Sequence, residues 1–514
     1  MPSARRRLAL VATLSAVLAL AGCVAPVHQV TPPTANPSAA VPPSSAPAGS
    51  EKYYTQHVDW SSCPKGTQAD QCATIDVPLD WADPSGATVK LAVARDAATG
   101  GNPVGSIFVN PGGPGASAID FLSTVDTIMS AEVRDEYDLV AFDPRGVARS
   151  TPVTCYDGPQ MDELTAADFD LTTDAGVQAQ EDAWGAFGKA CAAHTQAGVL
   201  GHIDTVTSAR DMDVVRALVG DVTLDYLGYS YGTKLGATYA ALFPTTVGRM
   251  VLDSALDPKV DGDAMSAGQA AGFESALRAY VTDCLGGSRC PLSGSVDNAM
   301  GQIKTMLDRT HTSPLPTSSG RRLTAPLAFT GIAYPLYSQS AWPQLTTALR
   351  AALAGDGSVL LALSDAYYDR AADGTYTTNT TEAFSAISCL DLPATTDLAK
   401  MRADAAQIAQ VAPTVGEFFS YSGTLCAQWP VPAVGGLTDY SAKGAPPILV
   451  IGTTNDPATP YVWAQALASE LSSGVLLTHV GEGHGVYGLG NACATSAVDD
   501  YFLDGTTPAV GTRC

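Results

Sequence analysis

The sequence is poor in basic residues and in long apolar runs. Its 514 residues include 28 Lys and Arg against 51 Asp and Glu, a formal net charge of −23. Because phosphate backbones and anionic headgroups repel such a surface, this balance excludes nucleic-acid binding as the main role. After residue 22, no apolar run approaches the roughly 18 residues that a membrane-spanning helix needs. The composition, 46% hydrophobic and 15% charged, instead fits a globular protein with a sizeable core.

Zinc motifs are also missing. No Cys-x-x-Cys or His-Glu-x-x-His spacing occurs, so we expect no metal site, and no other cofactor is indicated. The sequence has 11 cysteines, and setting Cys23 aside leaves an even number, which suits disulfide pairing in an oxidising compartment. Proximity in sequence, the only guide among many possible pairings, suggests Cys63–Cys72, Cys155–Cys191, Cys284–Cys290, Cys389–Cys426 and Cys493–Cys514.

The N-terminus has the pattern of an export signal. Three arginines at 5–7 precede an almost wholly apolar run over 8–20. Leu20-Ala21-Gly22-Cys23 follows and resembles a bacterial lipobox, which predicts cleavage before Cys23 and lipidation of its thiol. The alternative is an ordinary secretory signal with an incidental cysteine. Residues 24–50 are rich in proline and contain no Asp, Glu, Lys or Arg, as expected of a tether.

These features predict where the protein is located. We expect a signal peptide over 1–22 and a lipidated cysteine with its tether over 23–50. The folded body would then be anchored on the outer face of the cytoplasmic membrane, or be released extracellularly. Its only contact with the membrane would be through the lipid.

The rest of the chain reads as an interrupted α/β domain. From about residue 74, short β-rich runs alternate with helical stretches such as 208–219 and 233–242. Most runs are continuously apolar, as in parallel strands covered on both faces. The expected strands are Ser106–Asn110, Tyr137–Asp143, Asp225–Leu227, Arg249–Leu252, Pro447–Ile451 and Val475–Val480. We predict a mostly parallel, doubly wound sheet built from residues 51–255 and 441–514, with a mainly helical lid domain over 256–440 inserted between core strands.

Gly228-Tyr229-Ser230-Tyr231-Gly232 fits the pattern Gly-x-Ser-x-Gly. The pattern alone is weak in a glycine-rich chain, but an apolar run precedes it and an Ala-rich helical stretch follows. A strand, a tight turn and a helix in this order form a nucleophile elbow, where small residues flank a strained serine. Ser230 is therefore the predicted nucleophile, and the alternative is a Gly-Ser turn without function.

A serine nucleophile needs a base, and the base needs a residue that orients it. With this elbow the chain order is Ser, then Asp or Glu, then His. His484 follows a late strand in a glycine-rich loop and is the predicted base. Asp456 follows the strand at 447–451 and is the predicted acid, the alternative being a turn or helix-capping aspartate. Thr459 is placed to hydrogen-bond the Asp456 carboxylate, or else caps the next helix.

The oxyanion hole should come from the loop after an early strand and from the residue that follows the nucleophile. Between Pro111 and Pro114 only two glycines carry an N–H, and we predict the backbone N–H groups of Gly113 and Tyr231 as donors. The alternative is a tight turn without catalytic meaning. Nearby, Asp143 and Arg145 are expected to form an ion pair that steadies this loop.

Five motifs stand in one order along the chain: Asn110-Pro-Gly-Gly-Pro-Gly115, Asp143-Pro-Arg-Gly146, Gly228-Tyr-Ser-Tyr-Gly-Thr233, Asp456-Pro-Ala-Thr-Pro460 and Gly483-His-Gly485. With them, residues 55–514 resemble secreted actinobacterial tripeptidyl aminopeptidases and their mycobacterial lipoprotein relatives, in the prolyl aminopeptidase branch of the α/β-hydrolases. Ala148 departs from the pattern, which usually has a second glycine there. Pro111 stands where the proline-specific members carry histidine, which argues against simple proline iminopeptidase activity.

The resemblance implies an α/β-hydrolase fold and a serine peptidase that removes short peptides, tripeptides in this group, from the free N-termini of peptides or proteins. Ser230 would attack the scissile carbonyl, His484 would transfer the proton and Asp456 would hold the imidazole. Such an enzyme also needs lid carboxylates to pair with the substrate's α-ammonium, and Asp391 and Glu382 are candidates. The alternative for both is a carboxylate without a role in binding. We expect a monomer.

Two other functions remain open from the sequence. A carboxylesterase or lipase of the cell envelope would use the same triad, and a different lid would distinguish it. A non-catalytic cell-surface binding protein would be expected to carry a damaged triad, whereas all three triad residues and the oxyanion glycines are present.

Overall fold

The computed structural model describes residues 47–514. The signal peptide, the predicted lipidation at Cys23 and residues 24–46 of the tether lie outside the described residues and stay predictions. The described chain begins with a short helix, α1 (Glu51–Tyr54), whose two tyrosines are buried.

Within these residues the centre of the fold is an eight-stranded sheet of order β1-β2-β4-β3-β5-β6-β9-β10. Neighbouring strands from β4 to β10 pair in parallel, and β2 is antiparallel to both β1 and β4. The strands are β1 (Gln71–Pro78), β2 (Thr88–Asp96), β3 (Gly105–Asn110), β4 (Tyr137–Phe142), β5 (Leu224–Tyr229), β6 (Val247–Asp253), β9 (Ile448–Asn455) and β10 (Gly474–Glu482). All six expected strands are present, so the prediction of a mostly parallel sheet is confirmed. The strands β1 and β2 were not predicted individually.

Alternate residues of each central strand face opposite layers of helices. Phe108 and Tyr226 pack in one core cluster, whereas their neighbours Val109 and Leu227 pack in the other. The first layer contains α6 (Thr205–Val219), α7 (Tyr231–Leu242) and α15 (Tyr461–Glu470). The second contains α2 (Ala118–Ile128), α3 (Ala131–Glu136) and α16 (Ala492–Asp504). Continuous apolar runs in these strands therefore result from burial on both faces.

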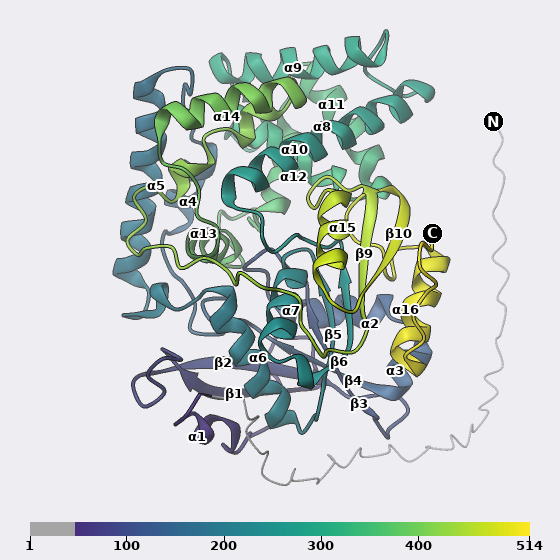
Figure 1. The fold of residues 1–514 in the computed structure, drawn as a ribbon. Coiled ribbons are helices and arrows are strands. Elements are labelled where there is room, and N and C mark those ends of the chain that lie inside the picture. Colours follow the sequence, from purple (N-terminus) through teal and green to yellow (C-terminus); the bar gives the residue numbers. More distant parts are fainter. Residues whose placement is uncertain (1–46) are drawn as a thin grey trace, which may run out of the picture. The chain divides into compact units, whose positions relative to one another are not determined.

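A separate helical region follows β6 and has a hydrophobic core of its own. Figure 1 shows most of these helices gathered at the top of the view, on one side of the sheet. They are α8 (Gly262–Gly286), α9 (Val296–Thr312), α10 (Ala325–Leu336), α11 (Trp342–Leu353), α12 (Ser358–Tyr367), α13 (Thr380–Asp391) and α14 (Leu398–Val411), with a small hairpin of β7 (Leu315–Pro316) and β8 (Arg322–Leu323). We call this region the lid.

Two helices between β4 and β5 also pack against the lid: α4 (Gly158–Ala166) and α5 (Asp174–His194). The Asp162 carboxylate on α4 accepts two hydrogen bonds from the Arg370 guanidinium, at 2.5 and 2.7 Å. The Gln180 amide on α5 donates to the Thr424 hydroxyl at 3.0 Å. The helical layer over the core therefore includes α4 and α5, which lie within residues 51–255, the first part of the predicted core.

The five disulfides that sequence proximity suggested are all present in the described chain. One of them, Cys389–Cys426, ties α13 to a later turn of the lid.

The prediction of an ion pair between Asp143 and Arg145 is wrong. Arg145 is buried and donates to both oxygens of Asp211 on α6, each at 2.6 Å. Asp143 instead accepts a hydrogen bond from the Ser117 hydroxyl at 2.7 Å and lies 3.4 Å from the Arg149 guanidinium. Proximity in sequence did not reveal that the two side chains leave the loop toward different helices.

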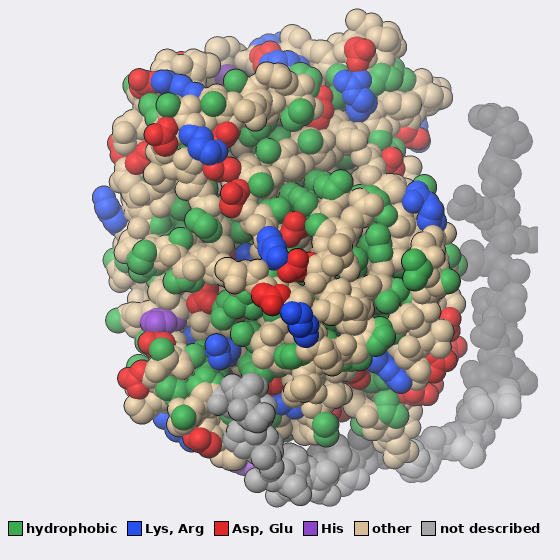
Figure 2. Space-filling model, viewed as in Figure 1, with side chains coloured by type: hydrophobic (Ala, Val, Ile, Leu, Met, Phe, Trp, Pro, Cys, Tyr) green, Lys and Arg blue, Asp and Glu red, His purple; other side chains and the backbone are tan. Residues whose placement is uncertain are grey.

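The outer surface carries charges of both signs. On the face shown in Figure 2, acidic and basic side chains are interspersed among hydrophobic and uncharged ones. Among residues 47–514, no helix combines the length and the apolar character needed to cross a membrane.

Candidate active site

Ser230 occupies a tight turn between β5 and α7. Its backbone has φ 56° and ψ −125°, a conformation that a serine rarely adopts. The two flanking glycines make the turn possible: a Cβ at Gly228 would lie 2.6 Å from the Gly232 carbonyl oxygen, and one at Gly232 would lie 2.8 Å from the Asn110 carbonyl oxygen. The local geometry is that of a nucleophile elbow, as the sequence predicts.

His484 and Asp456 come together at the ends of β10 and β9. The His484 Nδ1 atom lies 2.9 Å from each carboxylate oxygen of Asp456. The backbone N–H groups of Ala458 and Thr459 both donate to Asp456 Oδ1 at 2.9 Å, and the Thr459 hydroxyl donates to Oδ2 at 3.0 Å. Asp456 is therefore held in place from several directions, and Thr459 contacts it as expected.

Opposing effects act on the pKa of His484. Burial alone lowers this pKa, but the negative charge of Asp456 and the hydrogen bond to it raise it by more, and the charge of Asp253 adds to the increase. The net result is a pKa above the ordinary histidine value. A lid residue also contacts the histidine: the His484 backbone N–H donates to the Tyr337 carbonyl at 2.9 Å, and the two rings meet edge to face.

Ser230 opens into a cavity of about 1060 Å³ between the core and the lid. Gly113 and Tyr337 line the same cavity, which places the nucleophile, the glycine loop and the lid residue that contacts His484 around one space. No hydrogen bond joins Ser230 to His484 in the described part of the chain; in enzymes without substrate this contact is often long.

The glycine loop after β3 lies directly against the elbow. A Cβ at Gly112 would be 2.9 Å from Ser230 Cβ and 3.0 Å from the Tyr231 nitrogen. The Gly112 N–H is already used, because it donates to Asn110 Oδ1 at 2.9 Å. Gly113 lines the cavity beside Ser230, and the Tyr231 N–H belongs to the first turn of α7, where N–H groups lack helical acceptors. This placement suits the predicted oxyanion hole of Gly113 and Tyr231.

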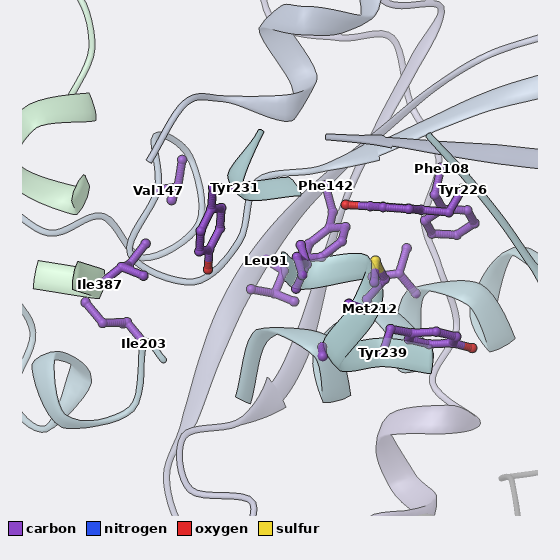
Figure 3. Close-up of a cluster of buried hydrophobic side chains, with 14 of the residues drawn as sticks. Leu91, Phe108, Phe142, Val147, Ile203, Met212, Tyr226, Tyr231, Tyr239 and Ile387 are labelled. Atoms are coloured by element: carbon purple, nitrogen blue, oxygen red, sulfur yellow. The ribbon is translucent and has the colours of Figure 1, made fainter. Parts of the chain in front are cut away.

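The side chain of Tyr231 anchors that N–H. Its ring lies near Val147, Ile203 and Ile387, the last of which belongs to lid helix α13 (Figure 3). Its hydroxyl is 2.5 Å from the Thr205 hydroxyl. Core and lid thus both hold the residue next to the nucleophile.

Asp391 and Glu382 do not have the positions that the ammonium-binding prediction needs. Asp391 is buried beneath the elbow, where it accepts a hydrogen bond from the Thr205 N–H at 2.9 Å and lies 3.5 Å from Lys234 Nζ. Glu382 accepts hydrogen bonds from the backbone of Cys155 and Tyr156. Neither residue lines the cavity, so the prediction is corrected: both carboxylates hold α13 against the core.

Other acidic side chains, which the sequence did not single out, do line the cavity. His311 Nδ1 lies 2.7 Å from Asp168 Oδ1, and its Nε2 lies 3.4 Å from Glu417 Oε2. Hydrogen bonds to these two carboxylates raise the pKa of His311 to about 10. The second oxygen of Asp168 is buried and has no hydrogen-bond partner. No sequence motif joins these three residues, which come from separate segments.

Aromatic side chains form much of the remaining wall: Phe169, Trp184, Phe273, Phe329, Tyr337, Tyr367, Tyr368, Phe384, Phe418, Phe419 and Tyr421. Several of these rings pack on one another. The Phe329 and Phe418 rings are stacked, with their centroids 4.5 Å apart. Across residues 47–514, no group of three His, Cys, Asp or Glu side chains is arranged to hold a metal ion.

The chain is similar in sequence to several known hydrolases. Residues 412–514 match a family described as TAP-like protein. The chain is 36% identical over 477 residues to the serine protease Hip1 of Mycobacterium tuberculosis, covering 89% of this chain and 91% of that protein. It is 38% identical over 516 residues to carboxylesterase B of the same species, covering 99% of each. It is 31% identical over 470 residues to the tripeptidyl aminopeptidase of Streptomyces lividans, covering 89% of this chain and 86% of that protein.

The electrostatics of His484 predict a pH profile. A general base must be unprotonated, so its raised pKa places the acidic limb of kcat/KM above pH 6.5, the ordinary histidine value. Asp456→Asn removes the charge that raises this pKa. The limb then moves to lower pH, and kcat falls by about 10³–10⁴-fold. Hydrolysis of an activated aryl ester between pH 5 and 9 measures both effects. An unaltered enzyme with its limb below pH 6.5 would contradict this assignment.

Asp391 has a structural role that can be tested. Because Asp391 and Lys234 are both buried, Asp391→Ala leaves an unpaired cation and lowers the free energy of unfolding by about 3–5 kcal/mol. Asp308→Ala, which breaks the exposed pair with Lys304, is the control and should change it by less than about 1 kcal/mol. Denaturant unfolding measures both variants. Equal free energies of unfolding for the two variants would contradict a stabilising role for the buried pair of Asp391 and Lys234.

Proposed function

This chain belongs to the actinobacterial tripeptidyl aminopeptidase-like α/β-hydrolases, and from that premise we propose that it removes short peptides from the free N-termini of extracellular peptides or proteins. One observation carries the proposal: a serine on a nucleophile elbow and a glycine loop line one large cavity, and a His–Asp pair stands at the neighbouring strand ends. The enzyme is a serine hydrolase, and the cavity supports a peptide substrate.

The reaction follows from the placement of these groups. His484 Nε2 accepts the proton of Ser230 as the serine oxygen bonds to the scissile carbonyl carbon. The N–H groups of Gly113 and Tyr231 stabilise the negative charge that develops on the carbonyl oxygen. The imidazolium then gives its proton to the leaving amine, and an acyl-enzyme remains. Water, activated by His484, hydrolyses this ester and frees Ser230.

Charge in the cavity supports recognition of a free N-terminus. Asp168 and Glu417 share His311, which is positive, so the cluster keeps a net charge of one negative unit. Asp168 and Glu417 both line the cavity, so their carboxylates offer charged hydrogen-bond acceptors to an α-ammonium group. The aromatic wall suits substrates with apolar side chains.

The N-terminal segment supports a proposal for where the enzyme acts. A lipid on Cys23 and the proline-rich tether would hold the enzyme at the outer face of the cytoplasmic membrane, where it would act as a monomer on peptides outside the cell. Nucleic acid is not among the partners that we propose.

Carboxylesterase activity is the second candidate. The relative that covers 99% of this chain is named carboxylesterase B, and an aromatic cavity also suits an acyl group. An ester substrate needs no free amine. Asp168 and Glu417 would therefore contribute to substrate binding in an aminopeptidase but not in an esterase.

Three matched substrates separate these functions: a tripeptide anilide with a free amine, its N-acetylated form and a short acyl ester. We expect hydrolysis of the free-amine peptide, with Ser230→Ala inactive. Comparable cleavage of the acetylated peptide would indicate an endopeptidase. Cleavage of the ester alone would identify an esterase and contradict the proposal.

A variant of Asp168 tests the amine site directly. Asp168→Asn should lower kcat/KM for the free-amine peptide by about 10–100-fold, because it removes a charged hydrogen-bond acceptor. Any residual cleavage of the acetylated peptide should not change. Asp59→Asn, at an exposed position, is the control.

A further inference from the structure

Two buried residues at the end of β6 have no part in the reaction described above. Asp253 is the last residue of β6, and Ser254 follows it. Both residues are fully buried. β6 lies between β5 and β9, with Asp253 paired to Tyr229 on one side and to Ile451 on the other. The end of β6 is therefore enclosed by the segments that carry Ser230 and Asp456.

The main chain of this pair contacts both of those segments. The Asp253 carbonyl accepts a hydrogen bond from the Ser230 N–H at 3.0 Å. The Thr459 hydroxyl lies 2.9 Å from the Ser254 carbonyl oxygen and 3.0 Å from Asp456 Oδ2, so its single proton is shared between these two acceptors. The backbone of two residues thus contacts the nucleophile directly and the acid through Thr459.

The side chains of the pair contact the third segment. Ser254 Oγ accepts a hydrogen bond from the Gly485 N–H at 2.6 Å. Asp253 Oδ2 accepts from the N–H groups of Val486 and Tyr487, at 3.0 and 2.8 Å. These three donors directly follow His484 in the chain, so the two side chains determine the course of the loop that carries the imidazole.

Two features of Asp253 and Ser254 lower the stability of the fold and are not explained by a structural role alone. Ser254 has φ 52°, in the left-handed region that serine seldom occupies. Asp253 Oδ1 is buried without any hydrogen-bond partner, which costs free energy. Backbone strain and unpaired buried polar atoms are more frequent at functional sites than elsewhere.

We propose that Asp253 and Ser254 are positioning residues for catalysis, which fix the His484 loop relative to Ser230 and Asp456. The carboxylate of Asp253 also places a second negative charge near the imidazole. The charged and titratable groups around His484 are Asp456 and Asp253, with the Tyr337 ring from the lid, and Asp253 in turn faces Tyr229. Burial raises the pKa of Asp253 to about 6, and its charge raises the pKa of His484. The imidazolium that forms during the reaction is therefore stabilised from two sides.

The proposal rests on the triad and not on the substrate class, so it is tested with whichever substrate the unaltered enzyme cleaves and Ser230→Ala does not. Failure of all substrates would contradict the proposed function and not this inference. Asp253→Asn keeps an oxygen for Val486 and Tyr487 but removes the charge. We expect kcat to fall about tenfold with KM changed less than twofold. The acidic limb of kcat/KM should move to lower pH, because the charge that raises the pKa of His484 is lost.

Ser254→Ala removes the acceptor for Gly485 and leaves the charge in place. It should lower kcat without moving the acidic limb. Asp225→Asn is the control: Asp225 is a partly buried carboxylate near the amino end of β5, its pKa is also raised by burial, and it accepts a hydrogen bond from the Arg249 backbone N–H. This control should lose stability while keeping kcat and the pH profile.

Thermal unfolding of each variant separates folding from catalysis. If Asp253→Asn is folded and has the kcat and the acidic limb of the unaltered enzyme, the inference is wrong. Should that variant fail to fold, Ser254→Ala decides the question, and an unchanged kcat in a folded Ser254→Ala protein overturns the inference.

Discussion

The parallel register of β5, β6, β9 and β10 is the constraint on which the rest of the structure depends. Because these strands run in one direction, their carboxyl ends meet at one edge of the sheet, and the residues that follow them become neighbours although they are far apart in sequence. Ser230 follows β5, Asp456 follows β9 and His484 follows β10. A change in the register of any one strand would separate these three residues. Burial of β5, β6 and β9 on both faces, by helices of two layers, helps to maintain that register.

The lid contacts the segments that carry the catalytic residues at this edge of the sheet. Tyr337 accepts the His484 N–H, and α13 packs against the glycine loop, since a Cβ at Gly115 would lie 2.8 Å from the Thr380 carbonyl oxygen. At the other end of α13, Asp391 is bound to Lys234 and Thr205 beneath the elbow. One lid helix thus contacts both of the segments that supply the predicted oxyanion donors. Changes in the lid can therefore alter the site without touching the triad itself.

The sequence predicts the local geometry of the site well where that geometry depends on a short pattern. The elbow needs small residues on either side of Ser230, and His484 needs a glycine-rich loop after a strand, so both can be recognised from a few neighbouring residues. Prediction from the sequence fails where a side chain's partner is set by packing: Arg145 binds Asp211 and not Asp143, and Asp391 is paired beneath α7 instead of facing substrate. Asp168, His311 and Glu417 could not be found because they come from three segments with no shared motif. The role of α4 and α5 beside the lid is likewise a result of tertiary packing.

The central claim is that this edge of the sheet forms a working serine nucleophile. Reaction of the purified protein with a fluorophosphonate, followed by peptide mapping with mass spectrometry, tests that claim most directly, because the reagent labels only a serine that an adjacent base has activated. The account predicts one modified residue, Ser230, and a large loss of labelling rate in His484→Ala. Labelling at another serine, or equal labelling of the His484→Ala protein, would contradict it.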